Sequence, residues 1–469
     1  MQNSYLFYDL ETSGLNKCFD QVFQFAAIRT DLDLKEVDRY KIFVKLNPDV
    51  IPSPMAVLVH QITFAEMQNG IGEDEAMLEI HRLFNTPGTI SVGYNSLDFD
   101  DEFLRFSFYR NLLAPYTHQY ANNCGRMDIY PMLVMYYLFK PATVNWPKIN
   151  GIPSLKLEHL GKANGLATGN AHAAMNDVEV TLRLARLLKK EQAMWDYLCG
   201  CFDKKTDLAR LVKLTFVADK YRGGLLIDGN LGAAKFYQSS VVGLGLHNHY
   251  KNQSLWLPLD CFALFDINNS NIATATFVNR KRFGEPPLLL PLCDRFNRYL
   301  SNDRLQLMAT NLIWLKKNPE LFSEIASYHR EYKYPIIPDL DVDAALYQIG
   351  FISDEERWQC DRFHITNSQG KIAIIDNFVN NNLRLQALRI MGRNYPEALT
   401  KRQDLYAEFM SYMTQIRSGK VILNYKNEVR LTPHAALAEI ENLRQTRSLS
   451  QVQSKLLTEL SENLLKKFT

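Results

Sequence analysis

Apolar and polar residues alternate with two different periods in the first 190 or so residues. Short runs of bulky apolar residues predict β-strands, which occupy residues 5–10, 21–31, 41–48 and 89–95. Apolar residues at helical spacing predict helices, which occupy residues 73–85, 100–113, 127–139, 154–165 and 174–192. Strands followed by this alternation are typical of an α/β sheet domain with helices on its faces.

The pattern changes near residue 200. From about 205 to 300, short β-like runs are separated by Gly, Asn and Pro, which predicts a small antiparallel barrel or sandwich. These runs occupy residues 211–219, 223–230, 240–250, 254–260, 273–279 and 285–291. After about residue 345 helical periodicity dominates, which predicts a C-terminal all-helical domain. Its clearest segments are residues 382–395, 402–419 and 434–446.

Length and charge narrow the class of protein. A chain of 469 residues is too long for one typical core, so we expect about two to four domains. Apolar residues make up 46% and charged residues 22%, which is typical of a soluble globular protein. The net charge is only +2, so a nucleic-acid-binding surface must gather its positive groups locally.

The cysteines and the N-terminal sequence indicate the cellular compartment in which we expect the protein. The seven cysteines are scattered and include no C-x-x-C pair, which favours reduced thiols in a cytoplasmic protein and argues against a structural zinc site. The N-terminus lacks a basic region followed by an apolar stretch, so we expect no signal peptide. No apolar run approaches the roughly 20 residues that a membrane-spanning helix needs.

Two acids stand at the end of the first predicted strand, in the stretch FYDLETSGLN. Asp9 and Glu11 are two positions apart, so their side chains point to the same side of the strand. Two like charges on one face repel each other, and a divalent cation between them would relieve the repulsion. Taken alone, the pair is better explained as polar turn residues after an edge strand.

Further residues extend this acidic pattern. Asp100 follows a predicted strand and opens a helix, and His172 lies five residues before Asp177. Singly, each has an ordinary explanation: an acid favoured by the helix dipole, a hydrogen-bonded histidine, a solvated helix position. Lys156 could be a simple exposed charge. The ordered combination is much harder to obtain by chance.

The order D-x-E-T-x-G, then an Asp before a helix, then H-x-x-x-x-D resembles the DEDDh exonuclease superfamily. The resemblance implies that Asp9, Glu11, Asp100 and Asp177 are metal ligands and that His172 is the general base. It also implies that Glu11 takes part in catalysis and contacts the substrate. Two divalent ions about 4 Å apart can stabilise both the attacking and the leaving oxygen of a phosphodiester. Mg²⁺ and Mn²⁺ prefer oxygen ligands, so we expect two Mg²⁺ ions, with Mn²⁺ as a substitute.

Longer stretches resemble the bacterial exodeoxyribonuclease I family, and they occupy residues 23–31, 93–116, 145–166 and 170–181. The resemblance implies degradation of single-stranded DNA from its 3′ end to nucleoside 5′-monophosphates, in DNA repair and recombination. It also implies a C-shaped clamp of three parts. These are a ribonuclease H-like α/β exonuclease domain (1–192), a β-rich SH3-like barrel (193–349) and an all-helical C-terminal domain (350–469).

The same resemblance implies DNA contacts from Arg105, Tyr116 and Asn170. Lys156 is then a substrate-phosphate contact at a position where the family often has Arg, so bidentate geometry is lost. The mixture of aromatic and basic residues at 103–116 could supply both stacking surfaces and phosphate neutralisation. The basic run at 279–284 is better explained as a solvated turn than as a nucleic-acid-binding patch.

The expected partners are single-stranded DNA and the acidic C-terminal tail of the single-stranded DNA-binding protein. We expect a monomer with no membrane association. One alternative is an exoribonuclease of the same superfamily that trims RNA 3′ ends, although such proteins are usually near the size of one domain. The other is an inactive nucleic-acid-binding module with a nuclease fold, against which the presence of all five expected site residues argues.

Overall fold

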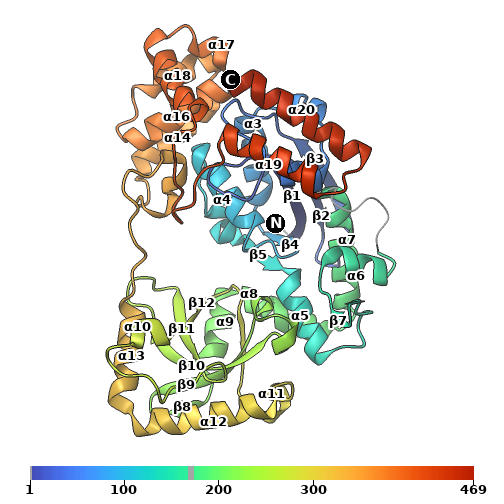
Figure 1. Cartoon of the computed structure of the whole chain (residues 1–469), viewed down its shortest axis with the longest axis vertical. Coiled ribbons are helices and arrows are strands. Elements are labelled where there is room, and N and C mark those ends of the chain that lie inside the picture. The colour runs from blue at the N-terminus through green and yellow to red at the C-terminus, as the bar shows by residue number, and fades with distance from the viewer. Residues whose placement is uncertain (1–2, 167–173, 469) are drawn as a thin grey trace. The chain divides into compact units, whose positions relative to one another are not determined.

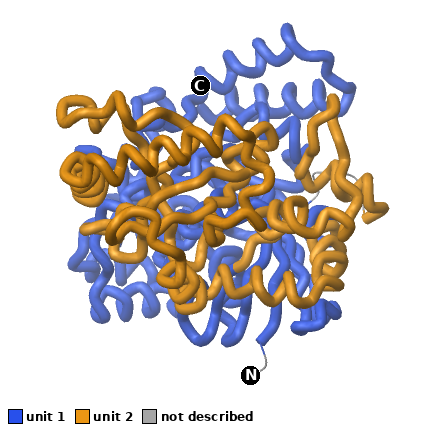
Figure 2. The backbone as a smooth tube through the Cα atoms, turned by 90° about the horizontal axis from the view of Figure 1, so that it is seen from below, with its two compact units in different colours: residues 1–126, 168–179, 336–469 blue, residues 127–167, 180–335 orange. Residues whose placement is uncertain are grey.

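The computed structural model describes residues 3–166 and 174–468 (Figure 1). The chain divides into two compact units, which Figure 2 distinguishes by colour. The first unit contains residues 1–126, 168–179 and 336–469, and the second contains residues 127–167 and 180–335. The domain bounds predicted from the sequence stay predictions.

A mixed sheet begins the chain. Among the described residues it has five strands in the order β3-β2-β1-β4-β5. The strands are β1 (Ser4–Thr12), β2 (Val22–Thr30), β3 (Glu36–Phe43), β4 (Thr89–Gly93) and β5 (Gly125–Asp128). β1 pairs with β2, and β2 with β3, in antiparallel fashion, whereas β1 and β4 are parallel. β3 begins before residue 41, where we predicted a strand to start, because this edge strand is largely exposed and charged residues occupy its first half.

Alternate residues of β1 build the core of the first unit. Leu6, Tyr8 and Leu10 are buried against α3 (Glu73–Phe84) and α4 (Asp100–Arg110). Fully burying one large apolar side chain contributes about 1.5–3 kcal/mol. Both helices lie where the sequence predicts them. α3 covers this face of the sheet with an apolar stripe, whereas α4 is buried on most of its faces.

Three further helices lie where the helical patterning predicts them. They are α5 (Ile129–Phe139), α6 (Leu157–Ala163) and α7 (Ala174–Lys189). A short hairpin of β6 (Lys148–Ile149) and β7 (Ile152–Pro153) precedes α6.

Among the described residues up to 211, four α-helices were not predicted. They are α1 (Pro54–His60), α2 (Phe64–Gln68), α8 (Gln192–Phe202) and α9 (Lys204–Leu211). α1 and α2 have seven and five residues, which is too short for an apolar stripe to repeat. In α8 the buried Trp195, Leu198 and Cys201 recur every three residues, a signal that could have revealed this helix.

An antiparallel sheet forms the centre of the second unit, as the sequence predicts. Its order is β12-β11-β10-β9-β13, and β8 pairs with β9. The strands are β8 (Phe216–Ala218), β9 (Tyr221–Ile227), β10 (Gln238–Leu246), β11 (Gln253–Pro258), β12 (Asn279–Arg282) and β13 (Leu288–Leu290). The helices that follow β8 in this unit are α10 (Ile272–Ala275), α11 (Asp294–Asn297), α12 (Asn302–Lys317) and α13 (Pro319–Glu331).

Two parts of this unit differ from the prediction. Residues 273–279 were expected to be β-like, but α10 occupies their first half. The helices α12 and α13 were not expected, although Leu312 and Leu315 of α12 and Phe322 and Ile325 of α13 show the helical spacing that could have revealed them. These side chains pack in one core with apolar residues of the sheet.

The basic run at 279–284 is not a solvated turn, so that prediction is wrong. Most of it is strand β12, and the side chain of Lys281 is fully buried. Its ammonium group donates to the carboxylate of Asp207 at 2.5 Å and to the carbonyl of Arg282 at 2.9 Å. Burial lowers the pKa of Lys281 and nearby Asp207 opposes this shift. The partner lies 74 positions earlier in the chain, where local pattern cannot indicate it.

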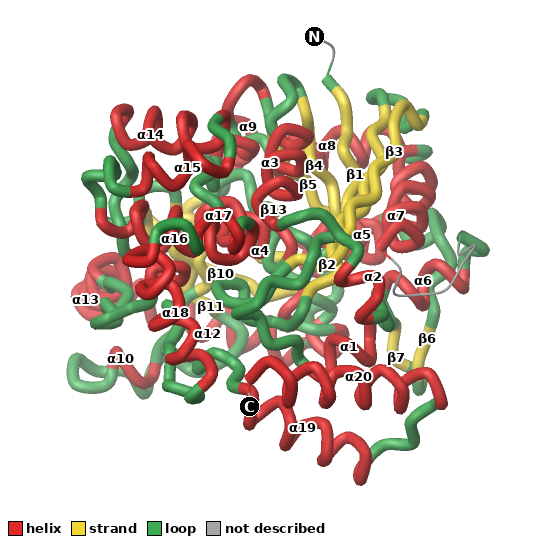
Figure 3. Tube along the Cα trace, turned by 90° about the horizontal axis from the view of Figure 1, so that it is seen from above, coloured by secondary structure: helices red, strands yellow, loops and turns green. Residues whose placement is uncertain are grey.

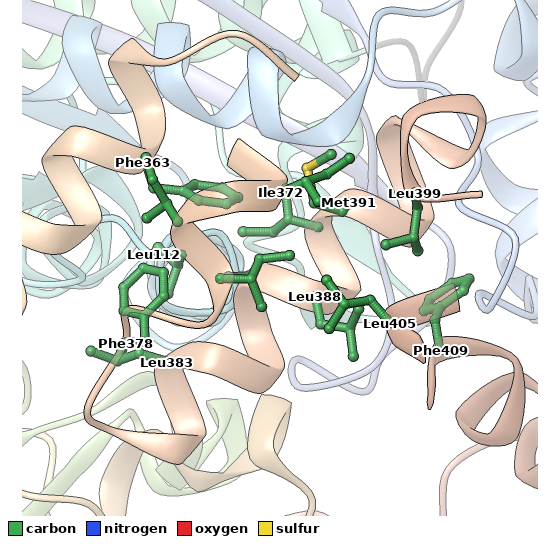
Figure 4. Packing of buried hydrophobic residues seen from close by; sticks show 14 of the residues in the cluster. Leu112, Phe363, Ile372, Phe378, Leu383, Leu388, Met391, Leu399, Leu405 and Phe409 are labelled. Atoms are coloured by element: carbon green, nitrogen blue, oxygen red, sulfur yellow. The ribbon is translucent and has the colours of Figure 1, made fainter. Parts of the chain in front are cut away.

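The C-terminal region is helical, as predicted. Its helices are α14 (Asp354–Ile365), α15 (Ser368–Ile375), α16 (Asn381–Asn394), α17 (Pro396–Leu399), α18 (Gln403–Arg417), α19 (Pro433–Thr446) and α20 (Gln451–Phe468). α14 to α18 share one apolar core (Figure 4), and α19 lies beside α20 (Figures 1 and 3). Within residues 3–166 and 174–468, none of the helices combines the length and apolar character needed to cross a membrane.

Candidate active site

The end of β1 presents its two acids on one face. Side chains alternate along a strand, so Asp9 and Glu11 point away from the face that carries Tyr8 and Leu10. Tyr8 and Leu10 are buried in the core, whereas Asp9 and Glu11 are half-buried. The strand is buried on both faces as far as Phe7, and beyond that residue the face with Asp9 and Glu11 is less buried than the face with Tyr8 and Leu10.

The pairing of β1 with β2 shifts immediately after the second acid. Glu11 faces Gln24, whereas the next residue, Thr12, faces Val22. Such a bulge bends a strand and re-aims the side chains beside it. The irregularity therefore coincides with the point where the two acids leave the sheet.

The turn after β1 explains the glycine of the D-x-E-T-x-G motif. A Cβ atom on Gly14 would lie 2.3 Å from a carboxylate oxygen of Asp20. That carboxylate accepts a hydrogen bond from the backbone N–H of Asn16 at 2.7 Å and one from the Ser13 hydroxyl at 3.2 Å. Burial raises the pKa of Asp20 to about 6, and these hydrogen bonds oppose the shift. A side chain at position 14 would displace this carboxylate.

Asp100 reaches the same edge of the sheet through β4. Because β1 and β4 are parallel, their carboxyl ends lie at one edge, and the loop after Gly93 leads from that edge into α4. A Cβ atom on Gly93 would lie 2.3 Å from the Ser96 hydroxyl oxygen, so this tight turn needs glycine. Asp100 is the first residue of α4 and is buried.

Asp177 joins the three acids from the first turn of α7. Burial raises the pKa of Asp9 well above its ordinary value, and the charges of Asp100, Glu11 and Asp177 raise it further. Burial likewise raises the pKa of Glu11 to about 8, with Asp177 and Asp100 adding to the shift. The fold therefore brings together four carboxylates that are widely separated in the sequence.

This donor set suits hard divalent cations. Carboxylate oxygens are the ligands that Mg²⁺ and Mn²⁺ prefer, and the mutual repulsion of the acids is the electrostatic condition that cations relieve. Within the described residues, no three Asp, Glu, His or Cys side chains are arranged closely enough to hold a metal ion as they stand. The fit to a cation rests on the chemistry of the carboxylates and on their repulsion.

The metal-free protein is expected to lose stability as the pH rises from 4.5, the ordinary value for Glu11, to about 8. In this range Glu11 keeps its proton when folded and loses it when unfolded, so the free energy of unfolding falls with rising pH. Saturating Mg²⁺ should remove this slope and release protons on binding. Thermal unfolding with EDTA and with Mg²⁺ across this range measures the effect. A metal-free melting temperature that rises across the range would contradict the prediction.

Asp101, next to Asp100, has a separate structural role that the sequence did not reveal. Its buried carboxylate accepts hydrogen bonds from Arg126 at 2.6 Å and from His118 at 3.0 Å, and it pairs with Arg105. Burial raises the pKa of Asp101, but Arg126, Arg105 and His118 outweigh it and hold that pKa well below its ordinary value. These contacts fix the first turn of α4, which carries Asp100.

The predicted DNA contacts Arg105 and Tyr116 lie near each other. The Arg105 guanidinium carbon is 5.9 Å from the centre of the Tyr116 ring. Arg105 is only 6% exposed because it pairs with Asp101, and Tyr116 is half-buried. Their contact with DNA stays a prediction.

The wider aromatic and basic mixture at 103–116 does not form the binding surface expected of it. Phe103, Phe106 and Phe108 are fully buried, and Arg110 forms an internal salt bridge with Glu73. These rings pack inside the apolar core, because α4 is enclosed on most of its faces.

The structure does not place three of the predicted site residues beside the acidic cluster. His172 and Asn170 lie outside the described residues. Lys156 belongs to the second compact unit, where it is exposed and directly precedes α6.

Comparison with known proteins extends these observations to the whole chain. Residues 6–185 match the family described as Exonuclease, and residues 340–466 match the family described as Exonuclease I C-terminal domain. Exodeoxyribonuclease I of Escherichia coli (strain K12) is 31% identical over 455 residues, which cover 92% of this chain and 93% of that protein.

Two solved structures are similar along their full length. The zinc ion bound form of the E. coli ExoI–ssDNA complex has a TM-score of 0.84 and 27% sequence identity, and the match covers 100% of both chains. A structure of SSB/Exonuclease I in complex with the inhibitor CFAM has a TM-score of 0.82 and 27% identity, again covering 100% of both chains.

The sheet, its acidic edge and the matching family together define an exonuclease. More narrowly, the similarity continues through the C-terminal helices and covers nearly all of the chain. The chain belongs to the exodeoxyribonuclease I family.

Proposed function

We propose that this chain hydrolyses single-stranded DNA from its 3′ end and releases nucleoside 5′-monophosphates. The observation that carries the proposal is the convergence of Asp9, Glu11, Asp100 and Asp177 at one edge of the sheet, where the other three raise the pKa of Asp9. Membership of the exodeoxyribonuclease I family supports the choice of DNA as substrate.

Four carboxylates would hold two Mg²⁺ ions, with Mn²⁺ as a substitute. When bound, such ions stabilise charge on the attacking and leaving oxygens of a phosphodiester. The rigid strand β1 orients Asp9 and Glu11, and the Asp101 contacts hold the helix turn that carries Asp100. Glu11 also contacts the substrate at its reactive end.

His172 acts as the general base and accepts the proton of the attacking water. The ordinary pKa of a histidine, about 6.5, suits proton transfer near neutral pH. Lys156 contacts a substrate phosphate as a point charge, and Arg105, Tyr116 and Asn170 contact the DNA strand.

The single-stranded DNA-binding protein is a proposed partner through its acidic C-terminal tail. A similar solved structure contains SSB together with Exonuclease I, which supports this choice. We further propose a monomer in the cytoplasm. All seven cysteines are free thiols, which supports a reducing compartment.

Digestion of one DNA strand, labelled at either end, tests the polarity. With Mg²⁺ present, the 3′-labelled strand should release labelled mononucleotide at once, whereas the 5′-labelled strand should shorten progressively. An RNA strand of equal length should stay intact, and Asp177→Ala should be inactive on every strand. Early mononucleotide release from the 5′-labelled strand alone would refute the proposed polarity.

Replacing His172 by Ala is expected to reduce turnover sharply and to leave metal binding nearly intact. The imidazole moves a proton, whereas the four carboxylates bind the cations. Single-turnover rates together with Mn²⁺ titration separate the two effects. A fully active variant would remove His172 from the mechanism.

A further inference from the structure

A hollow of about 320 Å³ lies within the first compact unit, and none of the four acids of the candidate active site lines it. Its walls come from residues 45–48, from the end of α2, from α16 to α18, and from the end of α20. Pockets of this size are at the lower end of those that bind small molecules. Its lining contains several cations and no carboxylate among the described residues.

Three of the lining cations form no ion pair with an acid in the described part of the chain. In residues 3–166 and 174–468, no carboxylate lies within salt-bridge distance of Lys45, Arg417 or Lys467. Lys467 is half-buried, and burial lowers its pKa, with Lys45 adding to the shift. Two ammonium groups are thus held close together at one hollow.

Asp49, the acid whose charge acts on Lys467, is already paired with other groups. The Asp49 carboxylate raises the pKa of Lys467, but this effect is smaller than those of burial and of Lys45. Asp49 is fully buried and already accepts hydrogen bonds from Arg393 at 2.8 Å and from the Tyr412 hydroxyl at 2.8 Å, and it pairs with Arg430. The positive charge of the hollow therefore remains available to an external anion.

The rest of the hollow is largely apolar. Phe409 and Met413 are buried, and Tyr406 and Met410 are half-buried. Leu399 and Phe409 lie at the same end of the C-terminal core (Figure 4). A methionine side chain adapts to ligands of irregular shape, and aromatic rings offer faces for stacking.

We propose that this hollow binds a phosphate monoester attached to a planar body, namely a nucleoside 5′-monophosphate. The phosphate would lie on Lys45, Arg417 and Lys467, and the base on the apolar wall. A compact dianion matches cations that share one hollow, whereas the charges of an acidic peptide would be spread along an extended chain. That this ligand is also the reaction product rests on the proposed function; the binding site itself does not.

Equilibrium dialysis of radiolabelled 2′-deoxyadenosine 5′-monophosphate against the whole protein in EDTA tests the proposal. Lys467→Glu and Lys45→Glu should each weaken binding about tenfold or more, which corresponds to about 1.4 kcal/mol. Lys466→Glu is the matched control, because Lys466 is exposed, adjacent in sequence and not part of the lining. Adenosine and inorganic phosphate should each bind about tenfold more weakly than the nucleotide.

Several results would overturn the proposal. Equal binding by wild type and Lys467→Glu would do so, and Arg417→Gln gives the same test if Lys467→Glu fails to fold. Loss of binding in Asp177→Ala would place the nucleotide at the catalytic carboxylates instead. Displacement by an equimolar polyglutamate peptide would assign the hollow to an acidic protein segment. The rate of DNA hydrolysis by these lysine variants is measured separately. It tests the proposed function and does not decide whether the hollow binds a nucleotide.

Discussion

Replacing Asp9 by Asn is expected to lower the rate of DNA hydrolysis by about 10³-fold or more. Stabilisation of transition-state charge by a bound cation contributes several kcal/mol, and each 1.36 kcal/mol changes the rate about tenfold. Asn keeps the shape of the side chain but removes a charge from the centre of the acidic cluster. Initial rates on a single-stranded oligonucleotide with Mg²⁺ measure the effect.

The same substitution should raise the melting temperature of the metal-free protein. The neighbouring carboxylates repel an ionised Asp9, so the gain should be greater at high pH than at low pH. Asp38→Asn on the exposed strand β3 is the matched control and should change neither activity nor stability. An Asp9→Asn protein with wild-type activity would exclude Asp9 from the site.

Replacing Asp49 by Ala is expected to lower the free energy of unfolding by about 3–5 kcal/mol. The buried carboxylate pairs with Arg393 at 2.8 Å and Arg430 at 3.3 Å, and its loss leaves both guanidinium groups buried with one fewer anion. Asp343 still pairs with Arg393 at 2.6 Å, which limits the loss in the free energy of unfolding. Urea unfolding followed by circular dichroism measures the change.

The contribution of Asp49 and its two arginine partners to the free energy of unfolding depends on pH. Burial raises the pKa of Asp49, but Arg393 and Arg430 outweigh it and hold that pKa far below its ordinary value of 3.8. Its stabilising contribution is therefore complete above about pH 4 and decreases as the pH falls further. The control is Asp404→Ala, which breaks an exposed pair with Arg402 and should leave the free energy of unfolding nearly unchanged. Equal losses in the two variants would contradict the role of burial.

Local patterns in the sequence were sufficient for much of the architecture. The spacing of apolar residues predicted α3 and the C-terminal helices because each covers a core with one face. Local patterns failed where charged residues lie in strands. β3 is a charged edge strand, and Lys281 is buried only because Asp207 neutralises it.

Some features of the candidate site also follow from local sequence patterns, whereas others need the tertiary structure. Asp9 and Glu11 share a face because strand geometry repeats every two residues, and this needs no tertiary information. The roles of Asp101 and His118 depend on a contact across 17 residues that neither residue signals alone.

By itself, the sequence determined the class of fold and the helical C-terminal region, because periodicity is a local property of a chain. Its motif spacing singled out the acidic residues that the structure brings together. Only the tertiary structure decided which charges meet. The parallel pairing of β1 with β4 brings Asp100 to the edge that carries Asp9, and the packing of α20 brings Lys467 near Lys45, in the segment after β3. Electrostatic energy depends on distance in space, and separation along the chain does not specify that distance.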